Sequence, residues 1–133
     1  MQAPRIYNLG EIIVGDSLIS DAPLSKEALS QILLTSRPTI KRYDEVCYWE
    51  IEDYRQQYPE LPREQWLIKK QKRDRTVPLS PYQIWIISGI QICFKHYRKE
   101  QPVRNYIKEH QYIFCHSTYE KRLVQLAKAA TAA

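Results

Sequence analysis

The sequence predicts a mainly α-helical fold with one small β-hairpin. Apolar residues recur at helical spacing in several segments, serine and proline stand where those segments begin, and one strongly basic segment has apolar flanks. Hydrophobic residues make up 44% of the 133-residue chain and aromatic residues 11%, which is enough to bury the core of a single domain.

The first 23 residues are predicted to form an N-terminal arm. They hold two of the three glycines and two prolines, and they show no helical period. We expect an extended segment here, with a short strand at residues 6–7 or 12–14.

Two short helices are predicted next, over residues 24–34 and 37–47. Ser25 and Ser36 are suitable N-caps, and Pro38 falls in the first turn of the second helix, where its missing N–H costs nothing. Two short helices joined by a tight polar turn have the geometry of a helix-turn-helix.

A β-hairpin is predicted over residues 66–79. One or two further helical turns over residues 48–58, ended by Pro59, precede it. Apolar flanks bracket a charged tip in which five of seven positions are basic. These are Lys69, Lys70, Lys72, Arg73 and Arg75. A basic hairpin after a helix-turn-helix is the arrangement of a winged helix-turn-helix, here assigned to residues 24–100.

The most apolar helix is predicted to begin at Ser80 and to run to about Lys99. Ser80 as N-cap, Pro81 at the first helical position and Gln83 as the partner of a capping box mark its start. Because the segment is apolar on most of its circumference, we expect it at the centre of the core.

Residues 101–133 are predicted to form C-terminal helices that pair two subunits. Pro102 marks the start of one short helix. Ser117 and Glu120 have the spacing of a capping box at the start of the last helix. The surplus of aliphatic and aromatic residues in this part of the chain is the reason for expecting a homodimer.

The distribution of charge favours a polyanionic partner. The formal net charge is +5, and the positive charges gather in the second predicted helix and in the hairpin tip. Arginine can read guanine, threonine can contact a phosphate or a thymine methyl, and lysines can contact phosphates. The predicted DNA-binding residues are Ser36, Arg37, Thr39, Lys41, Arg42, Lys69, Lys70, Lys72, Arg73 and Arg75.

Residues 24–45 resemble the DNA-binding segment of MerR-type regulators. The recognition helix of that family typically shows threonine, an aliphatic residue, arginine, an aromatic residue, tyrosine and an acid, and residues 39–44 read Thr-Ile-Lys-Arg-Tyr-Asp. In outline the chain is similar to the compact MerR-like repressors associated with type V-K CRISPR transposon systems. The resemblance implies that Thr39, Lys41, Arg42 and the wing contact DNA while the C-terminal helices dimerise.

The sequence departs from the family pattern in two places. Pro38 stands where the family often has an arginine, and the segment between Tyr48 and Trp66 is longer than a simple connection to a wing. We expect no small-molecule effector.

Other classes of protein find little support. The three cysteines and three histidines are scattered without metal-ligand spacing, and no nucleotide-binding or hydrolase motif occurs. We therefore expect no metal, no cofactor and no enzymatic activity. No apolar stretch suits a membrane span and no signal peptide is visible, so a cytoplasmic, nucleoid-associated protein is expected.

The resulting hypothesis is a sequence-specific, double-stranded DNA-binding transcriptional regulator, acting as a homodimeric repressor. Two alternatives remain open. One is an excisionase-like or architectural DNA-binding accessory factor of a mobile element. The other is a protein-interaction module whose basic loop docks an acidic partner.

Overall fold

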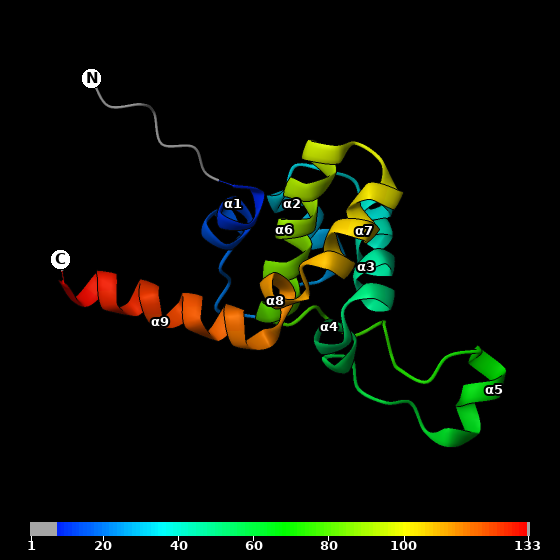
Figure 1. Cartoon of the computed structure of the whole chain (residues 1–133). Helices are drawn as coiled ribbons and strands as arrows, with labels where there is room; N and C mark the ends of the chain where they lie inside the picture. Colours follow the sequence, from blue (N-terminus) through cyan, green and yellow to red (C-terminus); the bar gives the residue numbers. More distant parts are fainter. Residues whose placement is uncertain (1–7, 133) are drawn as a thin grey trace.

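The computed structural model describes residues 8–132, and within that range the protein is built from helices and loops without a β-strand (Figure 1). The helices are α1 (Leu9–Asp16), α2 (Lys26–Ile32), α3 (Arg37–Glu50), α4 (Glu52–Gln56), the 3-10 helix η1 (Arg63–Gln65), α5 (Trp66–Lys69), α6 (Pro81–Tyr97), α7 (Glu100–Glu109), α8 (Gln111–Phe114) and α9 (His116–Ala132). The mainly α-helical character agrees with the sequence prediction. The predicted β-hairpin is not found among residues 8–132.

Helix α6 forms the centre of the core, and α1, α3, α4, α7 and α9 pack around it (Figure 1). Ser80 and Gln83 form the predicted capping box, with Pro81 in the first turn. The buried side chain of Gln83 also donates from Nε2 to the carbonyl of Tyr54, 3.3 Å away. The helix ends at Tyr97, slightly before the predicted limit, and Arg98 follows it with a φ of 64°.

Helices α2 and α3 pack against each other and are joined by a short turn. The side chains of Ser25 and Ser36 accept hydrogen bonds from the backbone N–H groups of Ala28 and Thr39, so both predicted N-caps are confirmed. The turn is tied to the core by Gln91, whose Nε2 donates to the carbonyl of Leu33 at 3.1 Å. Helix α3 runs three residues beyond the predicted limit, to Glu50, and its buried side extends to Tyr48.

The prediction of an extended N-terminal arm is wrong for residues 9–16, which form α1. Asn8 caps this helix by accepting from the N–H of Glu11, and its own amide donates to the Glu11 carboxylate. Ile13 is buried against α6, so tertiary packing stabilises a helix that contains two glycines. The candidate strand at residues 6–7 lies outside the described residues.

The predicted β-hairpin wing is wrong, and so is the winged architecture. Residues 66–69 form α5, and the chain from there to α6 is irregular apart from single bridges between Leu24 and Leu79 and between Glu60 and Arg73. Leu67 and Ile68 are 91% and 81% exposed, so no core face is available to hold a strand. In Figure 1, α5 and its connections, residues 59–76, project from the body as a long loop, which we call the α5 loop.

The last helix begins at His116, before the predicted cap, so Ser117 lies within its first turn. The N–H of His116 donates to the Asp53 carboxylate at 2.9 Å, which ties the start of α9 to α4. Tyr119 packs against Trp85 of α6, and Leu123 packs against the core one turn later. The C-terminal part of α9 then extends from the body (Figure 1). None of the helices between residues 8 and 132 has the length and apolar character needed to cross a membrane.

The contact between α1 and α6 leaves no space for a side chain at Gly89. A Cβ there would lie 2.9 Å from both Ile13 Cγ2 and Ser17 Oγ, whereas a Cβ at Gly15 would meet nothing within 4 Å. We expect Gly89→Ala to lower the free energy of unfolding by about 1–3 kcal/mol. Gly15→Ala, the matched control in α1, should raise it by up to about 1 kcal/mol through helix propensity. Urea unfolding followed by circular dichroism measures both, and equal effects would contradict this packing.

Candidate nucleic-acid interface

One face of α3 presents the predicted DNA-binding residues at its N-terminal end. Arg37, Lys41, Glu45 and Trp49 are exposed and four residues apart, so they follow one another along the same side of the helix. Ser36 caps the helix and its hydroxyl lies 2.9 Å from that of Thr39, which is half-buried. The two cations therefore stand at the end of α3 that follows the turn.

Next to this row of residues, α3 carries a buried carboxylate, Asp44, which acts as a hub for three other segments. Its Oδ1 accepts from the hydroxyls of Tyr54 and Tyr58, each at 2.5 Å. Its Oδ2 accepts from the guanidinium of Arg75, also at 2.5 Å. Burial, together with the neighbouring Asp44 carboxylate, raises the pKa of Tyr58, so this hydroxyl stays protonated and continues to donate.

Arg75, a predicted DNA-binding residue, is paired with carboxylates within the protein. Its side chain is only 20% exposed, and its second guanidinium nitrogen bonds to Glu45 at 2.9 Å. The guanidinium also lies 4.2 Å from the centre of the Tyr48 ring. A guanidinium occupied by two carboxylates and a ring has little left to offer a phosphate.

Arg73 is likewise turned toward the protein. It donates from Nη1 to the carbonyl of Tyr58 at 2.7 Å and lies 4.0 Å from the Glu60 carboxylate. Because Arg73 and Arg75 both bond to the body, they fix the returning end of the α5 loop. They do not point outward as the tip of a hairpin would.

The loop lysines remain available for a ligand. Lys69, Lys70 and Lys72 are exposed, and in the described part of the chain no carboxylate lies within 4.0 Å of them. Lys70 ends α5 with a φ of 55°, and the Lys72 ammonium lies 5.4 Å from the centre of the Trp66 ring. These three lysines are the part of the predicted basic tip that faces solvent.

A basic groove of about 400 Å³ lies between α2, α3 and residues 75–78. Arg37 and Lys41 line it, and Lys26 of α2 lies beside them. Burial lowers the pKa of Lys26, as do the nearby charges of Arg75, Lys41 and Arg37, against an opposing effect of Asp44. Sequence reasoning missed Lys26 because it belongs to the first helix, and only the fold brings it beside α3.

Arg42, the remaining predicted contact, lies on another side of α3. It bonds to Glu100 of α7 at 3.3 Å, and its guanidinium lies 4.9 Å from the centre of the Phe94 ring. The predicted set is therefore divided. Arg37, Lys41 and the three loop lysines remain candidates, whereas Arg42, Arg73 and Arg75 are committed to contacts within the protein.

A second pocket, of about 550 Å³, opens farther along the same side of α3. It is lined by aromatic and basic side chains of α3, α4 and the α5 loop. These are Tyr48, Trp49, Arg55, Lys70, Lys72, Arg73 and Arg75, together with Gln71. We call it the aromatic-basic pocket.

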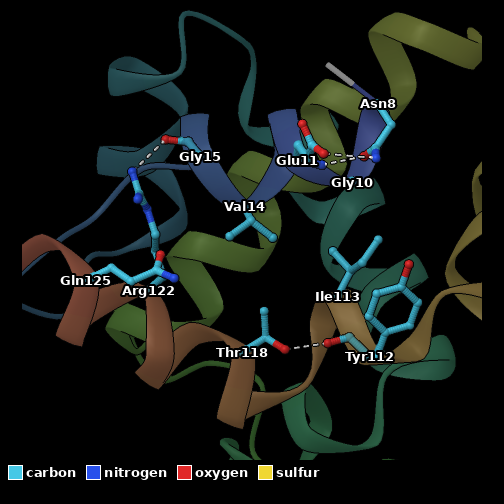
Figure 2. A pocket seen from close by; sticks show the side chains of 10 residues that line it. All are labelled: Asn8, Gly10, Glu11, Val14, Gly15, Tyr112, Ile113, Thr118, Arg122 and Gln125. Atoms are coloured by element: carbon cyan, nitrogen blue, oxygen red, sulfur yellow. Dashed lines mark hydrogen bonds between the residues drawn. The ribbon is translucent and has the colours of Figure 1, made fainter. Parts of the chain in front are cut away.

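A third pocket, of about 610 Å³, lies on a different side of the molecule, between α1, α8 and α9 (Figure 2). Arg122 reaches across it to the carbonyl of Gly15 at 3.3 Å, and Thr118 donates to the carbonyl of Tyr112. Its lining is largely apolar and amide. No group of three or more histidine, cysteine or acidic side chains suited to a metal occurs among the described residues.

Comparison with protein-family models, with curated proteins and with solved structures finds no match for this chain. The main feature of the site is the positive charge of Arg37 and Lys41 at the N-terminal end of α3, with further lysines on the α5 loop.

The Asp44 hub should dominate the stability of this interface. We expect Asp44→Ala to lower the free energy of unfolding by about 3 kcal/mol, because it removes three hydrogen bonds and leaves a poorly hydrated guanidinium with one partner fewer. Glu45→Ala, which removes the more exposed partner of the same arginine, should cost less than about 1 kcal/mol. Similar losses for the two variants in urea unfolding would contradict the role given to Asp44.

Proposed function

We propose that this protein is a helix-turn-helix transcriptional regulator that binds double-stranded DNA, with α3 as its recognition helix. The observation that carries the proposal is the charged face that begins at the N-terminal end of α3. Arg37 and Lys41 are exposed there, one helical turn apart, next to the turn from α2. An α-helix fits the major groove, where an arginine can contact guanine and a lysine a base or a phosphate.

The α5 loop supplies further phosphate contacts. Lys69, Lys70 and Lys72 are exposed on a segment whose return is fixed by Arg73 and Arg75. Because the loop is anchored to the body, it loses less conformational entropy on binding than a free tail would. This loop would contact the DNA backbone without being a β-hairpin.

The basic groove favours an anion on the same face. Lys26 lies among Arg37, Lys41 and Arg75, and their mutual repulsion contributes to the lowered pKa of its ammonium group. A phosphate oxygen at this groove would relieve the repulsion. The groove thus extends the phosphate track from the recognition helix toward α2.

We also propose that two copies pair through the C-terminal region and bind two half-sites. The C-terminal part of α9 extends from the body (Figure 1). Val124 on this helix is 52% exposed. In a symmetric dimer the two α3 helices would enter successive major grooves about 34–36 Å apart. Bound at a promoter, such a dimer would block transcription and act as a repressor.

Salt dependence of binding to duplex DNA tests the proposal. Five phosphate contacts in each subunit, one each from Arg37, Lys41, Lys69, Lys70 and Lys72, predict a log–log slope of about −4.5 for each bound subunit. The double variant Lys70→Glu and Lys72→Glu should make the slope shallower by about two. Fluorescence anisotropy with a labelled mixed-sequence duplex measures both values, and no binding at low salt would refute the proposal.

Charge reversal on α3 tests the role of the recognition helix. Lys41→Glu should weaken duplex binding by about 1–3 kcal/mol. Lys95→Glu makes the same change of charge on α6, at an exposed residue that lines neither the basic groove nor the aromatic-basic pocket, and should leave binding within about twofold. Equal effects would show that binding depends on net charge alone.

Sedimentation at micromolar concentration tests the pairing of two copies. We expect a dimer, and Val124→Glu should shift the protein toward the monomer, because it places a charge on an exposed apolar position of α9. A wild-type monomer, with or without DNA, would contradict the dimer.

A further inference from the structure

The aromatic-basic pocket has the lining of a second binding site, separate from the N-terminal end of α3. Its distinctive feature is Trp49, which is 60% exposed although it lies on a core helix. The indole N–H donates to Glu45 at 2.7 Å, and the Tyr48 ring meets the indole nearly edge-on, with 5.2 Å between ring centres. The indole is therefore held in place, so it can serve as a preformed stacking surface.

Positive charge converges on the same pocket. Arg55 donates to the carbonyl of Tyr48 at 3.0 Å, which fixes it at the pocket wall, and Lys70 and Lys72 approach from the α5 loop. Arg73 and Arg75 are already paired with carboxylates. Over the described part of the chain, no carboxylate lies within 4.0 Å of Arg55, Lys70 or Lys72. Three charges beside one aromatic surface are thus left for a ligand.

An aromatic ring beside uncompensated cations matches the two parts of a nucleotide. A base offers a flat face that stacks on an indole, and its phosphates pair with lysine and arginine. Inside a duplex the faces of the bases are covered by their neighbours, so only an unpaired base could use the indole in this way. An acidic peptide would satisfy the cations but would leave Trp49 unused.

We propose that the aromatic-basic pocket binds one unpaired nucleotide of a single-stranded nucleic acid. The base stacks on the indole of Trp49, and the adjoining phosphates pair with Lys70, Lys72 and Arg55. The pocket lies farther along the side of α3 that begins at Arg37, so a strand leaving the end of a duplex on α3 would reach it. Binding of single strands does not require the proposed duplex contact, and the two can be tested apart.

The test uses the full chain and a fluorescently labelled ten-nucleotide oligodeoxyadenylate, with binding followed by anisotropy at low salt. We expect Trp49→Ala to weaken binding at least about fivefold, and Trp49→Phe to restore part of the loss because it keeps a ring. The same Trp49→Ala variant should bind a blunt duplex within about twofold of wild type. Thermal unfolding of each variant confirms that it is folded.

Two neighbouring lysines give a matched pair for the phosphate contact. Lys70 lines the pocket and Lys69 does not, although both are exposed and adjacent in sequence. Lys70→Glu should therefore weaken binding of the oligonucleotide several-fold more than Lys69→Glu. Equal effects would show that the oligonucleotide responds only to the total charge of the loop, and this would overturn the proposal.

Three further compounds test which class of ligand the pocket binds. Oligoriboadenylate of the same length should bind with an affinity close to that of the DNA strand. A difference in affinity would show that the pocket contacts the sugar. With either strand, weaker binding by Trp49→Ala supports stacking on the indole. Adenosine monophosphate that binds as tightly as the strand would show that a free nucleotide is the ligand, and polyglutamate that competes equally well would show a protein-docking site. Either result, or oligonucleotide binding unaffected by Trp49→Ala, overturns the proposal. Loss of duplex binding alone would refute only the function proposed for α3.

Discussion

The interaction on which this side of the protein depends is the cluster around the buried carboxylate of Asp44. Two tyrosine hydroxyls and one guanidinium converge on it, and they come from α4, from the segment after α4 and from the end of the α5 loop. A buried charge is tolerated only when such partners surround it, so the cluster requires these segments to meet at α3. It therefore determines where the loop leaves the body and where it returns.

The same cluster divides the basic residues into two groups. The arginines of the loop are occupied at the body, where planar guanidiniums can bond to several acceptors at once. The lysines stay in solvent, where a flexible ammonium can follow a phosphate. Because Glu60 and Glu45 are paired with Arg73 and Arg75, the lysines of the loop are left without a carboxylate partner.

The sequence predicted those features of the fold that depend on local chemistry. Ser25, Ser36 and Ser80 cap helices as their positions suggest, since a cap is decided by residues within one turn. The hairpin failed because its segment is shaped by Asp44, some thirty residues away, which no local pattern reveals.

The candidate site was predictable in part for the same reason. Arg37 and Lys41 follow from helical spacing, and the spacing from Arg37 to Trp49 could also have placed that tryptophan on the exposed face. The roles of Lys26, Arg73 and Arg75 depend on tertiary contacts.

The attachment of α9 to α4 and α3 couples the position of the C-terminal helices to that of α3. The first N–H of α9 is bonded to Asp53, while Gln111 donates to the carbonyl of Glu50 at the end of α3. The C-terminal helices are thus coupled to the end of α3 that carries Trp49. Any movement of the start of α9 must therefore either carry the end of α3 with it or break these hydrogen bonds.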